Sequence, residues 1–361
     1  MQRFKIAVFE GDGIGPEIMA PTLKLLTKLA QAGGTYRLEF ETVPAGAGHY
    51  AKTGESLPHQ SLDAARQADA ILLSAMGLPD IRYEDGTEIS PQIDLRIALD
   101  LFAGVRPVRI RPGQPTPLRE MDRPVDFVLI RESTEGLFYT QGQGDLEKDE
   151  ARETLRITRA TSEKLFQFSF NLAMRRKGLG QGPGHVTCVD KANVFRAFAF
   201  FREIFDQQAK AFPDIATGHA YVDATALAMV QKPWMFDVMV TENMFGDILS
   251  DLGAGLMGGL GLAPSADIGA NHAVFQPCHG SAPDIAGQGA ANPLAMILSA
   301  AMMLDWLGNR FGLTKMIADS HLLTAAVDQV VEQGAVLTRD IGGTATTAEA
   351  AEAVERALEA M

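Results

Sequence analysis

Short apolar runs typical of buried strands alternate along this chain with longer amphipathic runs typical of helices. The strand-like runs are 5–9, 70–73, 125–130 and 237–240. The helix-like runs are 16–30, 91–101, a segment from Ile248 onward, and 293–307, with Ser90 and Pro91 as the cap and first residue of the second. This alternation predicts an α/β architecture.

The 361-residue chain is long enough for one large or two medium domains and carries a formal net charge of −13. Nucleic-acid-binding proteins usually present a basic surface, so we expect no nucleic-acid partner. A chain this acidic that binds an anion must do so locally, through clustered arginines or a metal ion. Arginine clusters are therefore the informative feature.

Cys188 and Cys278 are the only cysteines, and neither belongs to a C-x-x-C spacing. Two isolated cysteines of this kind are typical of buried or inert thiols in a protein of a reducing compartment. The longest apolar tract, 294–304, is well below the length of a membrane span, and the run 4–9 is too short for a signal-peptide core. We expect a cytoplasmic protein with no membrane partner.

A glycine-rich segment from Gly11 to Glu17 lies between the first predicted strand and the first predicted helix. Glycines there let backbone amides approach a ligand, and the helix N-terminus favours an anion. The spacing G-x-G-x-G-P is not the Rossmann fingerprint. A plain tight turn explains the segment equally well.

Three arginines occupy positions from which side chains converge on one crevice. Arg96 is on the predicted helix 91–101, Arg106 precedes a proline, and Arg131 directly follows the strand 125–130. The planar guanidinium group binds carboxylates in a bidentate manner. The alternative is three solvated surface arginines, and Arg131 fits it least because it follows an apolar strand.

Asp247 and Asp251 are four residues apart, where the strand 237–240 leads through a turn into a helix predicted to begin near Asp247. This spacing places both carboxylates on one helical face. They repel unless a cation lies between them, and hard oxygen ligands select Mg²⁺ or Mn²⁺. Alternatively, Asp247 caps the helix and Asp251 complements its dipole.

Two further segments carry candidate groups. Lys191, which has apolar residues near it in the segment 189–194, is a candidate for proton transfer, although a surface lysine is the common alternative. The loop 279–287, rich in small residues, is suited to holding an adenosine. In it, Asp284 would accept hydrogen bonds from ribose hydroxyls and repel a 2′-phosphate. An ordinary loop is the alternative.

In combination and in this order, these segments resemble the isocitrate/isopropylmalate family of metal-dependent, usually β-decarboxylating dehydrogenases. The matching stretches run from Gly11 to about Gly343, and the segments 246–251 and 279–284 are together specific to that family. The resemblance implies an isopropylmalate dehydrogenase-like two-lobed α/β fold, not a Rossmann fold. It implies a large cofactor-binding lobe of residues 1–101 and 258–361 and a smaller dimerisation lobe of residues 102–257.

The resemblance also implies roles for the charged residues. Arg96, Arg106 and Arg131 would bind the carboxylates of the substrate, and Asp247 and Asp251 would hold Mg²⁺ or Mn²⁺.

The other subunit of an obligatory homodimer would complete each active site. By the resemblance, its Asp223 finishes the metal shell and its Lys191 takes part in deprotonating the 2-hydroxyl group, with Asn193 beside that lysine.

The resemblance places the cofactor against the loop that follows position 278. The residues expected to bind it are His279, Gly280, Ser281, Ala282, Asp284 and Asn292. NADP-dependent members resembling isocitrate dehydrogenase carry lysine and tyrosine where this chain has Asp284 and Ile285, so we expect NAD.

The chain departs from the family at the tyrosine that protonates the product of decarboxylation. The family motif places this tyrosine seven residues after the Arg131 position, where this chain has Phe138, followed by Tyr139. Phenylalanine cannot donate a proton. Either Tyr139 serves, or another acid does, or decarboxylation is slow or absent; we favour Tyr139.

The segment before Arg96 sets substrate choice in the family. Ser90 matches a serine of isocitrate and homoisocitrate enzymes, and it would bind substrate, whereas Ile89, Gln92 and Ile93 replace the glutamate and leucines typical of isopropylmalate enzymes. We expect oxidation of a malate-type 2-hydroxy acid such as isopropylmalate, isocitrate or homoisocitrate. The alternatives are a non-decarboxylating tartrate or D-malate dehydrogenase and a catalytically impaired regulatory member.

Overall fold

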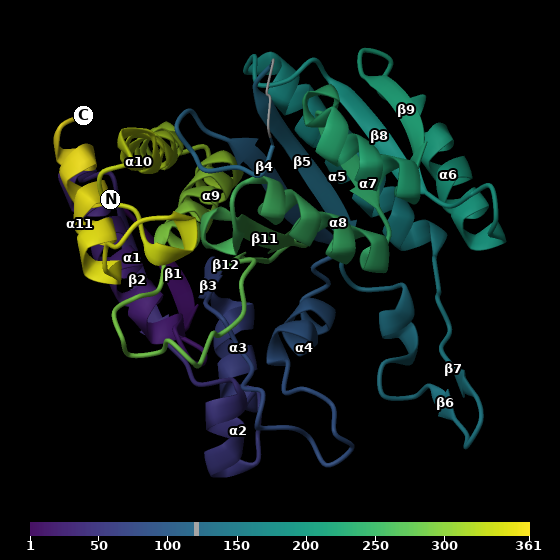
Figure 1. Ribbon diagram of the computed structural model, residues 1–361, viewed down its shortest axis with the longest axis horizontal. Helices are drawn as coiled ribbons and strands as arrows, with labels where there is room; N and C mark the ends of the chain where they lie inside the picture. Colours follow the sequence, from purple (N-terminus) through teal and green to yellow (C-terminus); the bar gives the residue numbers. More distant parts are fainter. Residues whose placement is uncertain (119–122) are drawn as a thin grey trace.

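A ten-stranded mixed sheet forms the centre of the computed structural model, which describes residues 1–118 and 123–361 (Figure 1). Its strands are β1 (Gln2–Phe9), β2 (Tyr36–Thr42), β3 (Ala70–Leu73), β4 (Ala103–Ile110), β5 (Val125–Glu132), β8 (His185–Asp190), β9 (Ala216–Tyr221), β10 (Val238–Thr241), β11 (Pro264–Ile268) and β12 (Ala273–Pro277). Their order is β2-β1-β3-β12-β11-β4-β5-β10-β8-β9. Neighbouring strands are parallel except at the centre, where β11 is antiparallel to β12 and β4, and β4 to β5. The predicted α/β class is confirmed.

Helices cover both faces of the sheet. They are α1 (Gly15–Gly33), α2 (Ala47–Thr53), α3 (His59–Gln67), α4 (Pro91–Ala98), α5 (Arg159–Gly178), α6 (Arg196–Ala209), α7 (Val222–Gln231), α8 (Asn243–Leu256), α9 (Leu294–Phe311), α10 (Thr314–Gln333) and α11 (Thr347–Glu359). On one face, α1, α5, α6, α9, α10 and α11 share a single apolar cluster. On the other face, α7 and α8 cover one apolar cluster and α3 and α4 cover another.

The separation of the two clusters on this second face positions the functional site. Leu249 of α8 packs with Leu129 of β5 in one cluster, and Leu95 of α4 packs with Leu73 of β3 in the other. Polar side chains from β4, β5 and β11 occupy the space between these clusters.

Most predicted elements are present, but several of their limits differ from the prediction by up to four residues, as at the ends of α1 and α9. The helix α4 begins at Pro91 after Ser90 as predicted, but it ends at Ala98, and Asp100 adopts a left-handed conformation with φ 51°. The helix α8 begins at Asn243, four residues before the predicted start, because the Glu242 carboxylate accepts backbone N–H bonds and caps it. Asp247 is therefore inside the helix and is not its cap.

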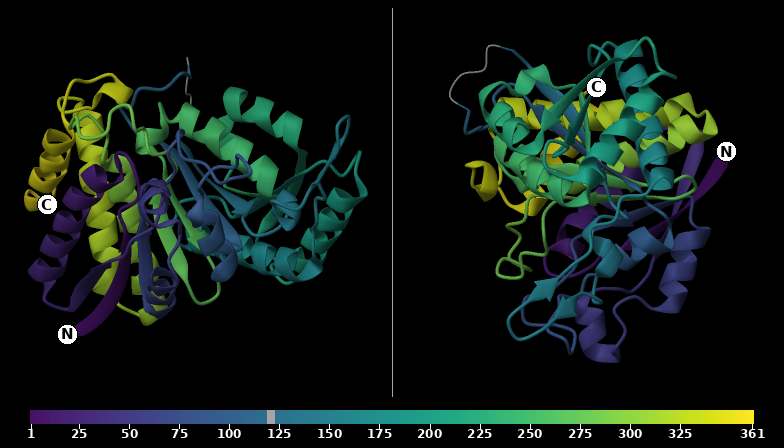
Figure 2. Two further views of the ribbon diagram at one scale, coloured as in Figure 1. Left: turned by 90° about the horizontal axis from the view of Figure 1, so that it is seen from below. Right: turned by 90° about the vertical axis from the view of Figure 1, so that its right-hand side faces the viewer.

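Both chain termini lie at one end of the molecule and the middle of the chain lies at the other (Figures 1 and 2). The sheet continues across the predicted boundary between lobes, because β11 pairs with β4. The limits of the two lobes stay a prediction. A short hairpin of β6 (Asp145–Leu146) and β7 (Ala151–Arg152) projects from the middle part. Among residues 1–118 and 123–361, no helix has both the length and the apolar character needed to cross a bilayer.

Candidate active site

The glycine-rich segment after β1 joins three loops at the carboxyl ends of the strands. The buried Asp12 carboxylate accepts hydrogen bonds from the backbone N–H groups of Ala47 (2.7 Å), Gly48 (2.8 Å) and Gly77 (2.8 Å). Gly13 has φ 58°, and a Cβ atom there would be 2.0 Å from the carbonyl oxygen of Ser281. This close approach requires glycine, so the segment does more than make a tight turn.

Asp267, on β11, holds two of the predicted arginines. Its Oδ2 atom accepts from Arg96 Nε at 2.9 Å and from Gln276 Nε2 at 2.7 Å, and its Oδ1 accepts from Arg106 Nη2 at 3.1 Å. Burial acts to raise the pKa of Asp267, but the charges of Arg96, Arg106 and Arg131 outweigh it and lower the pKa to about 2. Asp267 is therefore a charged support for the arginines.

Arg131 connects the arginines to the predicted metal ligands. Its guanidinium group donates to the Asp247 carboxylate, and its Nη2 and Nε atoms lie 2.7 and 3.2 Å from Asn243 Oδ1. Burial, together with the charge of Arg96, lowers the pKa of Arg131 to about 10. An anion in this position would relieve the repulsion between the guanidinium groups.

Asp247 and Asp251 line the same cavity from α8, as their spacing predicts. Burial and the charge of Asp247 raise the pKa of Asp251. A divalent cation would oppose both effects, and carboxylate oxygens suit Mg²⁺ or Mn²⁺. Among the described parts of the chain, no group of three or more His, Cys, Asp or Glu side chains could hold a metal ion. The two carboxylates fit such an ion but need a further ligand.

The cavity between these groups has a volume of about 190 Å³. The described chain contains three buried side-chain atoms without a hydrogen-bond partner, namely Ser74 Oγ, Gln92 Oε1 and His279 Nε2. All three residues line this cavity. Because an unpaired buried polar atom costs free energy, their convergence indicates a place for a polar ligand.

Comparisons with known proteins identify the kind of protein that has this arrangement. The family model described as isocitrate/isopropylmalate dehydrogenase matches residues 5–356. The chain belongs to this family. The 3-isopropylmalate/3-methylmalate dehydrogenase of Methanocaldococcus jannaschii is 41% identical over 355 residues, which cover 98% of both chains. The 3-isopropylmalate dehydrogenase of Streptococcus thermophilus is 42% identical over 362 residues, covering 97% of this chain and 98% of its own.

Solved structures support the same assignment. The isocitrate dehydrogenase of Methylococcus capsulatus aligns with a TM-score of 0.85 and 37% identity over 99% of each chain. The predicted fold and family are thus confirmed, and the chain is a dehydrogenase that acts on a CH–OH group. Arg96, Arg106, Arg131, Asp247 and Asp251, singled out in the sequence, come together in one cavity of this dehydrogenase.

Three of the predicted site residues lie outside that cavity of their own chain. Lys191 Nζ lies 2.7 Å from Asp223 Oδ1, and the Asp223 side chain is 69% exposed. Asn193 is also exposed, next to the exposed apolar side chains of Val194 and Phe195. A surface position is what a residue that completes a partner's site must have, and that role stays a prediction.

Ser90 and Tyr139 also lie outside the residues that line the cavity. Ser90 Oγ donates to the carbonyl oxygen of Glu88 at 3.1 Å. Tyr139 is on the 3-10 helix η1 (Leu137–Thr140) and is 47% exposed, with its ring 4.0 Å from the Arg156 guanidinium carbon. Neither prediction is tested by this arrangement.

The predicted cofactor loop runs from the cavity across the segment that follows β1. His279 and Gly280 line the cavity, and the carbonyl oxygen of Ser281 accepts from Ile14 N–H at 2.8 Å. Ala282 has a positive φ of 36°, and Asp284 is exposed beyond it. At the far end of the loop, Asn292 Nδ2 donates to Asp340 Oδ2 at 3.0 Å.

The loop offers polar groups to a ligand. Burial lowers the pKa of His279, so its ring is neutral near pH 7, and its Nε2 atom lacks a partner. The glycine segment brings backbone groups to within contact of the same loop. The loop and the glycine-rich segment together present polar groups, and their backbones lie in contact with each other.

Sequence reasoning missed three residues of the site: Ser74, Asp267 and Gln276. Asp267 and Gln276 are polar residues on the buried strands β11 and β12, where a charged or amide side chain is unusual. That signal was available in 264–277 but required those segments to be recognised as strands.

Proposed function

We propose that this chain is an NAD- and divalent-metal-dependent dehydrogenase that oxidises a malate-type 2-hydroxy acid and then decarboxylates the product. The observation that carries the proposal is that Arg96, Arg106 and Arg131 line one cavity with Asp247 and Asp251. Guanidinium groups bind carboxylates, and paired carboxylates bind a hard cation, so the cavity suits an anion that carries a coordinating hydroxyl group.

The arginines bind and orient the carboxylates of the acid. Arg96 and Arg106 are fixed by Asp267, so little side-chain freedom is lost when an anion binds. A bound divalent ion, held by Asp247 and Asp251, would lower the pKa of the 2-hydroxyl group. In this proposal Lys191 of the partner subunit, in its neutral amine form, accepts the hydroxyl proton, and Asp223 of the partner subunit completes the metal shell.

NAD, bound along the loop 279–292 with its ribose hydroxyls near Asp284, would supply the hydride acceptor. An aspartate disfavours the 2′-phosphate of NADP by charge repulsion. The exposed position of Asp284 supports this proposal. We expect catalytic efficiency with NAD to exceed that with NADP, and equal efficiencies would contradict it.

A homodimer is part of the proposal because the cavity lacks a third metal ligand of its own. Exposed apolar side chains adjoin the relevant carboxylates: Leu227 on α7 is 58% exposed and Ile248 on α8 is 63% exposed. Such side chains on neighbouring helices favour burial against a second copy. This surface adjoins both Asp223 and Asp247, which the proposal assigns to the two sides of one site.

The substituent at C3 of the acid is proposed to be polar. Four residues in the substrate-selecting segment were singled out, and only Gln92 of them lines the cavity; Ile89, Ser90 and Ile93 do not. The unpaired amide oxygen of Gln92 and the hydroxyl of Ser74 favour a group that forms hydrogen bonds over an isopropyl group.

The test is NADH formation with isopropylmalate, isocitrate, homoisocitrate, tartrate and D-malate in the presence of Mn²⁺. We expect turnover that EDTA abolishes, with a preferred acid that has a polar C3 substituent. Gln92→Leu should change the ratio of kcat/KM for isopropylmalate to kcat/KM for the preferred acid by about tenfold or more in favour of isopropylmalate. The substitution removes the amide that would form a hydrogen bond with the polar substituent. The absence of turnover with every acid, or turnover that ignores EDTA, would contradict the proposal.

A non-decarboxylating tartrate- or malate-type dehydrogenase is the second candidate. It is favoured by the position of Tyr139, whose ring packs on Arg156 outside the cavity while Phe138 holds the family's tyrosine position. Measuring CO₂ and NADH together separates the two candidates. Equal amounts support decarboxylation, and Tyr139→Phe should then slow CO₂ release; NADH without CO₂ supports the second candidate.

A further inference from the structure

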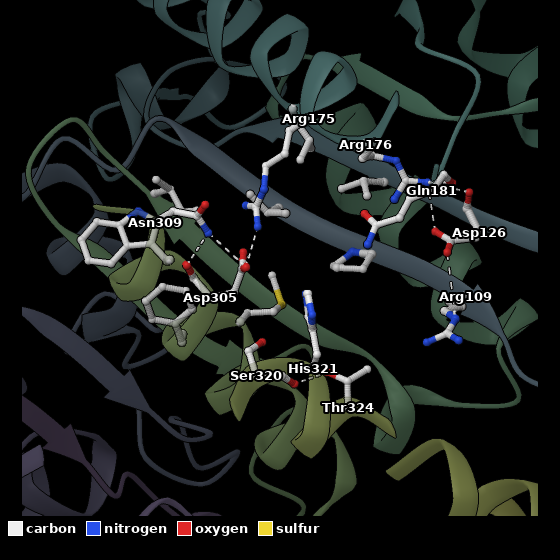
Figure 3. A pocket seen from close by; sticks show the side chains of 18 of the residues that line it. Arg109, Asp126, Arg175, Arg176, Gln181, Asp305, Asn309, Ser320, His321 and Thr324 are labelled. Carbon is white, nitrogen blue, oxygen red and sulfur yellow. Dashed lines mark hydrogen bonds and ion pairs between the residues drawn. The ribbon is translucent and has the colours of Figure 1, made fainter. Parts of the chain in front are cut away.

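A second, larger cavity lies on the opposite face of the sheet from Arg96, Arg106 and Arg131. Figure 3 shows side chains that line it. This groove has a volume of about 690 Å³. Its floor is formed by β4, β5, β11 and β12, one wall by α5, and the other by α9 and α10. The volume is in the range typical of small-molecule sites, which bury most of a bound ligand.

Part of the lining of the groove is apolar and aromatic. Phe168 and Leu172 project from α5, and Met302 and Trp306 project from α9. Phe275 on the floor packs against Trp306 with ring centroids 5.9 Å apart. Aromatic rings on the wall and floor favour a flat aromatic occupant, because ring stacking adds to the burial of apolar area.

The charged side chains of the groove neutralise one another. Arg175 Nη2 lies 2.5 Å from Asp305 Oδ1, and Arg109 Nη1 lies 2.7 Å from Asp328 Oδ2. Arg176 Nη2 is 3.0 Å from Asp126 Oδ1 (Figure 3).

Each arginine that lines the groove is thus paired with an aspartate that also lines it. Because three arginines and three aspartates balance in the lining, the groove offers a charged ligand no net attraction, while binding would still remove water from its charge. An uncharged ligand leaves the pairs intact, and the amides of Asn171 and Gln181 in the lining offer it hydrogen bonds.

We propose that this groove is a binding site for an uncharged aromatic small molecule. The proposal rests on the size, the aromatic lining and the balanced charges of the groove, and it does not depend on which hydroxy acid is oxidised.

Successive side chains along a strand point to opposite faces of the sheet, so this groove lies across the sheet from Arg106. Val105 and Pro107 face the groove on either side of Arg106, which faces the active-site cavity. In the same way, Ile268 in the groove follows Asp267, which contacts Arg96 and Arg106 on the other face of the sheet. An occupant would therefore contact the strands that position Arg106 and its carboxylate support.

Trp306 provides a local reporter for the test. The chain has two tryptophans, so Trp234→Phe leaves Trp306 as the only one. The probe is the neutral naphthyl ketone PRODAN, which accepts energy from tryptophan. We expect saturable quenching of Trp306 in the full-length protein.

Two matched variants on α10 locate the bound probe. Ala325 and Ala318 are both exposed, but only Ala325 lines the groove. Ala325→Phe should weaken probe binding by about tenfold or more, and Ala318→Phe should leave it unchanged, because only the first fills the site. Thr324→Phe, which also narrows the groove, serves as a second filling variant if Ala325→Phe unfolds at a lower temperature than Ala318→Phe.

Anilinonaphthalene sulfonate, which has a related ring system and a negative charge, tests whether the groove prefers an uncharged ligand. It should bind about tenfold more weakly than PRODAN at the site sensitive to Ala325→Phe. Quenching that does not saturate, or that is the same in the groove-filling and control variants, would overturn the binding site. Equal or tighter binding of the sulfonate would overturn the uncharged occupant.

Discussion

Gly246 of α8 lies directly against Arg131 of β5. A Cβ atom on Gly246 would be 2.6 Å from both the Cβ and the Cγ of Arg131, closer than real contacts allow. This close approach lets α8 carry Asp247 to the Arg131 guanidinium group, which contacts its carboxylate. The glycine that begins the segment 246–251 is therefore a packing requirement of the site.

Gly246→Ala should displace Arg131 and impair both stability and activity. We expect a loss of about 1–3 kcal/mol in the free energy of unfolding, as for other overpacked positions. We also expect kcat/KM to fall by about tenfold or more because the guanidinium group moves away from the acid. Gly255→Ala is the matched control on the same helix, since nothing lies within 4 Å of its added Cβ atom. Equal behaviour of the two variants would show that the contact is unimportant.

Asp267 should make folding stability depend on pH in the acid range. Its pKa is lowered to about 2 in the folded protein, so its contribution is present above the ordinary pKa of an unfolded aspartate and is lost as pH falls toward 2. For this one group the loss is about 1 kcal/mol between pH 5 and pH 3. Urea unfolding at a series of pH values measures it.

Asp267→Asn removes this titration and leaves Arg96 and Arg106 without their carboxylate. We expect it to be destabilised by about 3–5 kcal/mol at pH 5, because a buried pair is broken. The difference in the free energy of unfolding between this variant and the unsubstituted protein should become smaller as pH falls. A difference that is constant or widens between pH 5 and pH 3 would mean that Asp267 is not held in its charged form by the arginines.

Shared active sites predict recovery of activity in mixed dimers. Asp223→Asn and Asp251→Asn should each be inactive as homodimers. In a co-expressed mixture, half of the dimers contain one subunit of each kind, and each such dimer has one site with both carboxylates and one with neither. We expect about a quarter of the activity of the unsubstituted enzyme. If both residues serve a site within one chain, every site in the mixture is defective and no activity returns.

The strand and helix pattern was readable from the sequence because buried strands such as β3 are continuous apolar runs. The convergence of Arg106 and Arg131 was also predictable in outline, since both adjoin apolar segments. Their orientation was not, because it depends on the antiparallel register that pairs Arg106 with Leu129 and places Gly104 opposite Arg131. No local spacing encodes that register.

The supporting residues were missed for a related reason. Asp267 acquires its role only when β11 pairs with β4 and brings residue 267 to the arginine side of the sheet. The start of α8 was misplaced because a glutamate, which is not among the most favoured capping residues, caps it. The large groove behind the sheet has no sequence motif at all, since its lining comes from strands and helices across most of the chain.

Mn²⁺ binding, followed by the electron paramagnetic resonance signal of the free ion, tests most directly whether the carboxylates of α8 bind a divalent ion beside Arg96, Arg106 and Arg131. We predict that the protein binds Mn²⁺ more tightly as pH rises, because protons compete for Asp251, whose pKa is raised. Asp251→Asn should weaken binding by about tenfold or more, while Asp214→Asn, an exposed carboxylate elsewhere, should have no effect. Mn²⁺ binding that is absent, or is equal in all three proteins, would contradict the account.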